Sequence, residues 1–208
     1  MFSLQTIFGK GDKFYDLLLA SAQQASGSAQ ALQAIVNGEQ PPAMEAFDAA
    51  HQREKDLASE ISEGLINQFV TALDREDIEA LNSALYRIPK TIQKFAERYL
   101  IVSERLGSID FGPRAELLVR ATQVVEAMVG ELKRGLRIDR IKPLQERLQA
   151  IESEADRLLL EPYSALYLKS DDPLRAMLAK DLYELLEKAV DKCRDAGNVM
   201  YTIVLKNS

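Results

Sequence analysis

The sequence predicts an all-α fold of six long helices. Apolar residues recur at intervals of three and four residues along six segments, which is the period of an amphipathic helix. No segment alternates apolar and polar residues for long enough to require a strand. The connections between the segments are short, so consecutive helices are expected to be antiparallel neighbours. The helices are predicted over residues 12–36, 41–70, 75–106, 113–132, 140–161 and 173–205.

Capping and breaking residues separate the first three helices. The Asn-Gly pair at 37–38 stops the first helix, and the Pro-Pro pair at 41–42 suits the opening of the second. Thr71 and Asp74 offer capping oxygens before the third helix. Pro89 lies inside the third helix, where the missing N–H costs roughly 3 kcal/mol and is expected to kink the helix.

The clearest break in the chain lies at residues 107–113, which include two glycines and a proline placed to start the fourth helix. The Lys-Arg-Gly run at 133–135 stops that helix, and Asp139 is placed to cap the fifth. The fifth helix is expected to end ahead of Pro162. The Ser-Asp-Asp-Pro run at 170–173 supplies a cap and a first-position proline for the sixth helix.

Composition restricts the function classes. With 47% hydrophobic and 28% charged residues, the 208-residue chain reads as a globular protein with one large domain or two small ones. A net charge of −6 argues against a nucleic-acid surface. The single cysteine, Cys193, cannot form an internal disulfide, which fits a reducing cytoplasm. Residues 1–19 contain four charged residues and no sustained apolar run, so neither a signal peptide nor an integral membrane segment is expected.

The two halves of the chain show a short internal similarity. Residues 52–56 align with 152–156 without a gap, and 85–90 align with 186–191 in the equivalent helix. A duplicated unit predicts two pseudo-repeated antiparallel three-helix bundles. The first bundle would span residues 1–107 with a degenerate acidic motif. The second would span residues 113–208 with intact Glu-x-x-x-Asp motifs.

Four carboxylates of the second half form a candidate metal site. Glu152 with Asp156, and Glu187 with Asp191, stand four residues apart and therefore lie on one side of their helices. If the two helices are neighbours, the four groups converge as oxygen ligands for a metal ion. Helical periodicity places the four carboxylates near the surface, away from the apolar stripe of the last helix. Glu184 and Asp195 extend this acidic stripe as additional candidate ligands.

A plainer interpretation stays open. The same carboxylates suit a solvated acidic face that is balanced by Arg157, Lys188 and Lys192. At the positions that align with Glu152, Glu187 and Asp191, the first half has Gln52, Tyr86 and Lys90. A neutral amide, a phenol and an ammonium cannot replace carboxylates as ligands for a dication. A metal site, if present, therefore belongs to the second half.

Four stretches of the chain resemble the PhoU family of phosphate-signalling proteins, and more closely its Pit-accessory branch. They are residues 13–18, 69–78, 152–156 and 186–195. The most specific stretch, 69–78, reads Phe-Val-Thr-Ala-Leu-Asp-Arg-Glu-Asp-Ile, whereas the branch usually has Phe-Ile-Thr-Pro-x-x-Arg-Glu-Asp-Ile. Ala72 therefore departs from the pattern. The resemblance extends over nearly the whole chain.

The resemblance implies two three-helix bundles with surface clusters of iron, zinc or nickel ions. Carried over by position, it assigns metal ligation to Glu152, Asp156, Glu187 and Asp191. It also implies a cytoplasmic, non-enzymatic regulator or accessory protein of inorganic phosphate transport. The expected partner is a phosphate transporter or a phosphate-sensing membrane complex, met at the inner face of the membrane. A homo-oligomer is left open, and no nucleic-acid partner is expected.

Two other functions stay open beside this regulator. The first is a carboxylate-bridged metal enzyme, which would need a Glu-x-x-His motif from two helices. The only histidine is His51, and Asp48 precedes it by three, so His51 is interpreted as a partly exposed helix residue. The second is a structural helical module without metal. Cys193 adjoins the apolar stripe and is interpreted as packed rather than reactive.

Overall fold

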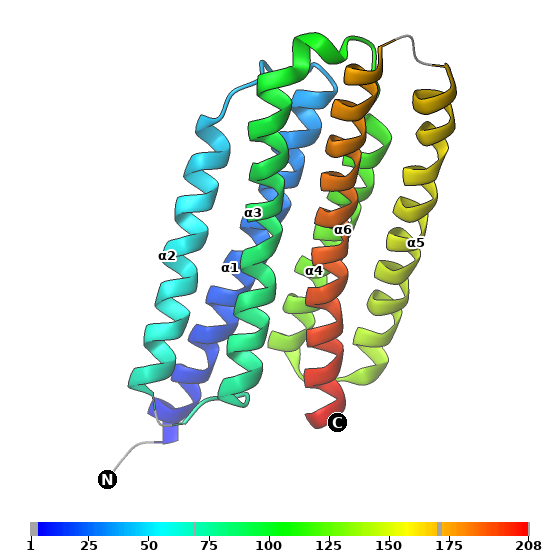
Figure 1. The fold of residues 1–208 in the computed structure, drawn as a ribbon. Helices are drawn as coiled ribbons and strands as arrows, with labels where there is room; N and C mark the ends of the chain where they lie inside the picture. Colours follow the sequence, from blue (N-terminus) through cyan, green and yellow to red (C-terminus); the bar gives the residue numbers. More distant parts are fainter. Residues whose placement is uncertain (1–3, 69, 170–171, 208) are drawn as a thin grey trace.

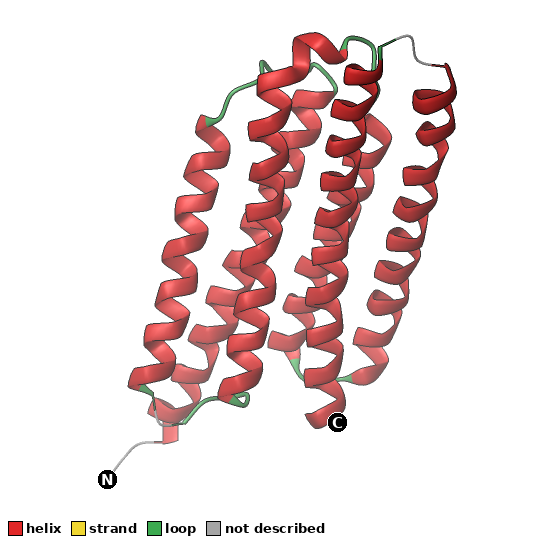
Figure 2. Ribbon diagram, in the orientation of Figure 1, coloured by secondary structure: helices red, strands yellow, loops and turns green. Residues whose placement is uncertain are grey.

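The computed structural model describes residues 4–68, 70–169 and 172–207, and side chains for 13–68, 70–158 and 172–207. Every regular element in this part of the chain is a helix, which confirms the all-α class (Figures 1 and 2). The helices are α1 (Leu4–Val36), α2 (Glu45–Asn67), α3 (Arg75–Leu106), α4 (Gly112–Arg134), α5 (Ile138–Lys169) and α6 (Pro173–Asn207).

Four helices form the centre of the bundle and two lie outside it. Each helix runs antiparallel to the one before it, as expected (Figure 1). In the centre, α3 packs along α6 and α1 packs along α4. Outside, among the residues that the structure describes, α2 contacts α1 and α3, whereas α5 contacts α4 and α6. The outer helices therefore each bury one face, while the central helices are buried on several sides.

One hydrophobic core runs through both halves of the chain. The largest fully buried side chains include Phe95, Phe111 and Leu18. Phe111 lies in the break between α3 and α4, and its ring centroid is 5.8 Å from that of Phe95 and 4.9 Å from that of Tyr183. The junction between the halves is thus held by aromatic packing. The division into bundles at residues 1–107 and 113–208 stays a prediction.

The bounds of α1 and α2 differ from those predicted by three to eight residues. The structure begins α1 at residue 4 instead of residue 12, and α2 at residue 45 instead of residue 41. The second helix also ends at Asn67, before the predicted residue 70. Arg75 explains this end, because its guanidinium donates hydrogen bonds to the carbonyls of Leu65 and Gln68. The last carbonyls of α2 thus have partners outside their own helix.

The prediction that α5 stops ahead of Pro162 is wrong, because the helix continues to Lys169. A proline inside a helix leaves the carbonyl four residues earlier without its usual N–H donor. That carbonyl belongs to Leu158, and the guanidinium of Arg114 on α4 donates a hydrogen bond to it. A side chain from a neighbouring helix therefore replaces the missing backbone donor.

The predicted caps are partly confirmed. Asp172 accepts a hydrogen bond from the Arg175 N–H at 3.0 Å, so it caps α6 ahead of Pro173. Ser170 and Asp171 lie outside the described residues. Asp139 does not cap α5, which begins one residue earlier. No helix in the described part of the chain is both long and apolar enough to cross a membrane.

At Gly197, α6 packs closely against α5. A Cβ at this position would lie 2.5 Å from Leu148 Cδ2 and 2.8 Å from Gln145 Oε1, both on α5. We expect Gly197→Ala to lower the free energy of unfolding by about 1–2 kcal/mol in urea titrations, because overpacking outweighs the gain in helix propensity. The matched control is Gly130→Ala on α4, where a Cβ meets nothing within 4 Å. That variant should be at least as stable as the wild type, and equal effects at both sites would contradict the packing.

Arg114 is expected to stabilise the bundle through its contacts at Leu158 and Tyr183. Its guanidinium carbon lies 4.1 Å from the centre of the Tyr183 ring. Replacing Arg114 with Met removes the donor to the Leu158 carbonyl and the cation–π contact, which should cost about 1–3 kcal/mol in chemical denaturation. Arg147→Met changes an exposed residue of α5 and serves as the control. Unchanged stability of the Arg114 variant would show that the α5 carbonyl needs no partner.

Candidate functional site

The α5–α6 contact brings carboxylates and one guanidinium together. Arg194 on α6 forms ion pairs through Nη1 with Glu152 of α5 and, at 3.2 Å, with Asp191. Its Nη2 lies 3.5 Å from Asp195, and Lys192 contacts the other oxygen of Asp195 at 2.7 Å. The exposed fractions are 17% for the Glu152 side chain and 29% for Asp191. The predicted convergence of the two helices' acidic residues is therefore present, with Arg194 between them.

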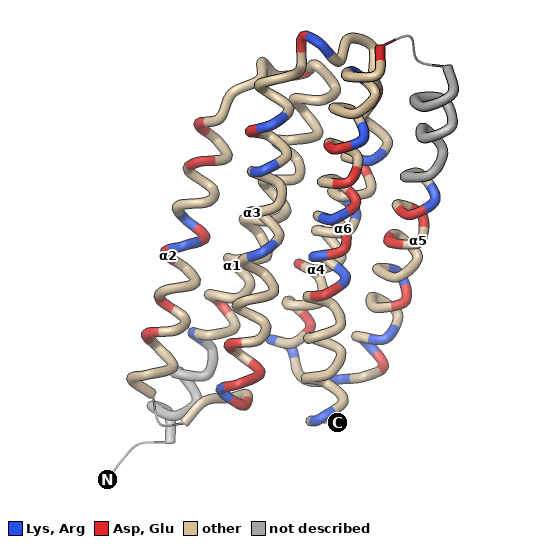
Figure 3. The backbone as a smooth tube through the Cα atoms, viewed as in Figure 1, with Lys and Arg blue, Asp and Glu red and all other residues tan. Residues whose placement is uncertain are grey.

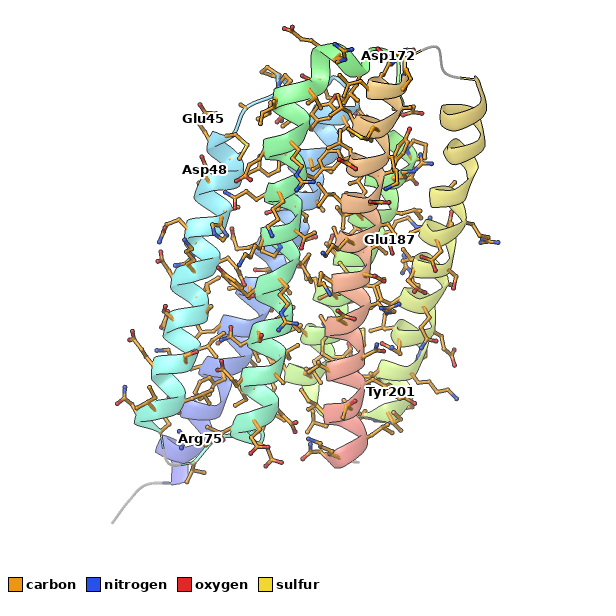
Figure 4. All side chains as sticks on the ribbon, in the orientation of Figure 1. Glu45, Asp48, Arg75, Asp172, Glu187 and Tyr201 are labelled. Atoms are coloured by element: carbon orange, nitrogen blue, oxygen red, sulfur yellow. The ribbon has the colours of Figure 1, made fainter. Side chains whose placement is uncertain are left out.

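Glu187 lies on α6 on the side facing α5 (Figure 4). Burial raises the pKa of Glu187 to about 7, and the negative charges of Asp191 and Asp156 act in the same direction. A hydrogen bond with Asp191 also favours the protonated form of Glu187. All four predicted ligands thus belong to one electrostatic cluster. Arg194 pairs with both Glu152 and Asp191, and the charges of Asp156 and Asp191 raise the pKa of Glu187.

The cluster is less exposed than the sequence suggested. The apolar stripe of α6 is buried as predicted at Leu182 and Met200, but Leu186, Val190 and Cys193 form a further buried row. This row is explained by the three neighbours of α6, namely α3, α4 and α5. The side of α6 that carries Glu187 and Asp191 is therefore half-covered by α5. Helical periodicity in a sequence identifies the widest apolar face of a helix, but it does not show how many neighbouring helices pack around that helix.

As arranged, these carboxylates do not form a ligand shell. Among the residues that the structure describes, no group of three or more His, Cys, Asp or Glu side chains is placed to hold a metal ion. Oε1 of Glu152 and Oδ1 of Asp191 both contact Nη1 of Arg194. A dication on the same oxygens would stand next to a permanent positive charge. The donor set therefore fits a metal only if Arg194 moves away, and metal ligation stays a prediction.

The corresponding region of the first half is polar or basic, as the sequence indicated. Gln52 donates a hydrogen bond to Asp56 at 3.0 Å, and Lys90 lies 5.4 Å from the centre of the Tyr86 ring. His51 is partly exposed, as predicted, with its ring 6.0 Å from that of Tyr86. Burial lowers the pKa of His51, and the positive charges of Lys55 and Lys90 act in the same direction. The negative charges of Glu97 and Asp48 oppose this effect on the pKa of His51 but do not outweigh it.

Glu54 is a buried carboxylate that sequence reasoning did not single out as a site. Its side chain is 0% exposed, Oε1 accepts a hydrogen bond from the Ser21 hydroxyl, and Oε2 has no hydrogen-bond partner among the described residues. Glu154, which aligns with Glu54 in the predicted repeat, instead pairs with Arg120 at 3.2 Å. Both carboxylates reach the first helix of their own half, but only Glu154 meets a cation there. Position 54 lies seven residues after Phe47 and three before Leu57, so the helical period of these buried residues places it on the same side of α2. That period is the signal that could have identified Glu54 as buried.

Cys193 is fully buried, which confirms that it is packed. Burial raises the pKa of its thiol, so the reactive thiolate is disfavoured.

Arg194 is the important residue that the sequence did not reveal. Its partner Glu152 is 42 residues away on another helix. Only the packing of α5 against α6 brings the two together.

No protein-family model matches the chain. Among curated proteins, the chain is 24% identical over 205 residues to the "Putative pit accessory protein" of Rhizobium meliloti (strain 1021), covering 94% of both chains. It is also 24% identical over 140 residues to the UPF0111 protein YkaA of Bacillus subtilis (strain 168), covering 67% of this chain and 68% of that protein.

Among solved structures, the crystal structure of a PhoU-like protein from Shewanella oneidensis MR-1 superposes with a TM-score of 0.71. The superposition covers 95% of this chain and 98% of that one, at 17% sequence identity. The predicted resemblance to the PhoU-like family is confirmed. The PhoU-like fold also explains why the acidic motif of α5 faces that of α6, because each outer helix packs against the last helix of its own half.

Glu54 is expected to make the stability of the protein depend on pH. Burial raises the pKa of Glu54 from 4.5 to about 7, while the hydrogen bond from Ser21 opposes the shift. The folded state therefore holds a proton that the unfolded state releases between these pH values. Stability should fall as pH rises from about 4.5 to about 7, by a loss on the order of 3 kcal/mol for this group.

Chemical denaturation of Glu54→Gln from about pH 5 to about pH 8 tests this dependence of stability on pH. The amide keeps an acceptor for Ser21 but does not titrate, so its stability should fall less with pH and exceed that of the wild type at the upper end. Glu63→Gln, on the exposed surface of α2, is the control. Parallel pH profiles for wild type and Glu54→Gln would show that Glu54 is charged in the folded protein.

Proposed function

We propose that this chain is a non-enzymatic accessory protein or regulator of inorganic phosphate transport. It would act in the cytoplasm by contact with a phosphate transporter or a phosphate-sensing membrane complex. The observation that carries the proposal is the end-to-end similarity to a protein named as a pit accessory protein, which covers 94% of each chain. The PhoU-like fold supports it independently.

The surface of α3 offers a contact for such a partner. Four exposed cations, which we call the α3 ridge, follow one another at intervals of three, four and four residues, so they lie along one side of the helix. They are Arg87, Lys90, Lys94 and Arg98. Lys and Arg positions recur along this helix in Figure 3. At 1.5 Å per residue the ridge is about 16 Å long.

The α3 ridge lacks internal counter-charges. None of its four cations forms an ion pair with another described residue; Arg87 donates to the Ser83 hydroxyl at 3.3 Å, and Lys90 lies over Tyr86. Elsewhere, cations such as Lys133 and Lys206 pair with carboxylates of other helices. In a chain of net charge −6, a row of unpaired cations suits an acidic segment of the transporter or sensor.

Phosphate uptake in a strain that lacks the gene tests the proposed function. Uptake at low and at high external phosphate should change on deletion and return when the wild-type protein is supplied. Unchanged uptake at both concentrations would refute the regulatory role.

The contact surface is tested in the same strain with Arg87→Glu/Lys94→Glu/Arg98→Glu, which should fail to restore uptake because the reversed charges repel an acidic partner.

A matched variant controls for overall charge. Arg53→Glu/Arg147→Glu/Arg157→Glu changes the same number of exposed cations, but these lie scattered over α2 and α5. This control should restore uptake, provided both variants show the helical content of the wild type. If both triple variants restore uptake, the regulatory function stands and the α3 ridge is not the contact.

A further inference from the structure

We propose that Arg194 is the resident cation of the α5–α6 acidic cluster, and that it occupies the position where a divalent metal would otherwise bind. The cluster would then hold α5 to α6 without a metal, and removing the guanidinium would open a site for a dication with carboxylate ligands. This inference is independent of the role in phosphate transport.

The contacts of Arg194 carry the proposal. Nη1 is shared by Glu152 of α5 and Asp191 of α6, while Nη2 faces Asp195 one helical turn further along α6. One guanidinium therefore joins three carboxylates from two helices. The Arg194 side chain is only 32% exposed, so solvent screens these contacts less than it screens a surface ion pair.

Other cations of the chain do not act in this way. Lys180 pairs with Glu184 and Lys142 with Glu146 along single helices, which are local contacts between neighbours four residues apart. Arg120 reaches from α4 to α5 but meets only Glu154. Within the part of the chain that the structure describes, Arg194 is the one cation with ion pairs to three carboxylates drawn from two helices.

Arginine chemistry explains why this arrangement excludes a dication. The guanidinium stays charged at every physiological pH and presents several N–H donors in a fixed plane, so it can satisfy two carboxylates at once. A metal bound to the same oxygens of Glu152 and Asp191 would have to displace this group or lie beside a like charge. With a neutral residue at position 194, the carboxylates would repel one another and favour a cation from solution.

Binding of Mn²⁺ tests the proposal, since oxygen ligands suit this ion and its free form is measured by electron paramagnetic resonance. The wild type, purified without chelator or affinity tag, should carry no stoichiometric metal and bind Mn²⁺ only weakly. Arg194→Gln should bind one Mn²⁺ per chain with a Kd at least about tenfold lower than that of the wild type. Its unfolding midpoint should rise on adding Mn²⁺ and fall again with EDTA.

Three control variants distinguish the loss of positive charge at position 194 from a general disturbance of the fold. Arg194→Lys keeps a positive charge and should not gain Mn²⁺ binding. Arg120→Gln frees a single carboxylate and should not gain it either. Adding Glu152→Gln and Asp191→Asn to Arg194→Gln should abolish the gain, because the proposed ligands are then neutral.

Two results would overturn the proposal. One is stoichiometric metal in the wild type that disappears in Glu152→Gln/Asp191→Asn; this measurement does not require the Arg194 variant to fold. The other is folded Arg194→Gln protein, judged by helical content, that binds Mn²⁺ no better than the wild type.

Discussion

The burial of α3 against α6 and of α1 against α4 is the constraint on which the rest of the structure depends. These four helices share one core, so their faces must be apolar or small on several sides. In α1, Ala22, Ala25 and Ala29 are fully buried, and in α6 Gly197 allows close approach to α5. The outer helices α2 and α5 need only one apolar face each, which leaves room for polar residues where they meet the centre.

Polar contacts also join the outer helices to the central ones. Each outer helix has such contacts both to the first helix of its half and to the last. Examples are Glu54–Ser21, Asp48–Gln93, Glu154–Arg120 and Glu152–Arg194. The halves differ in charge compensation at the aligned positions Glu54 and Glu154. The first half offers the Ser21 hydroxyl there, whereas the second half offers the Arg120 guanidinium.

The fold was largely predictable from the sequence, because helical periodicity and the breaks near 107–113 are local signals. The third helix was placed at its observed bounds, Arg75–Leu106. The fifth helix was cut short because local rules treat Pro162 as a stop, and nothing local shows that Arg114 serves the Leu158 carbonyl. Such errors follow from tertiary contacts that override sequence signals.

The candidate site was predictable only in part, for a related reason. The spacing of Glu187 and Asp191 shows that they share a helix side, and the fold brings that side to α5. The spacing does not show which cation lies between the helices. A basic residue next to an acidic motif on the same helix, such as Lys188, is a local counter-charge and draws attention first. Arg194 matters more because its partner Glu152 lies on a different helix.

The difference between the halves also bears on where a partner can bind. An acidic segment that approached Arg194 would have to displace carboxylates that already pair with it, and would leave them half-buried and unpaired. The cations of the α3 ridge have no such partners among the described residues, so a new ion pair there costs only partial desolvation and some loss of side-chain conformational freedom. Tyr86 and Lys90 stand at the positions that align with Glu187 and Asp191 in the predicted repeat, and this has two consequences. The first half lacks the carboxylate oxygens that a metal would need, and Lys90 offers positive charge for contact with another molecule.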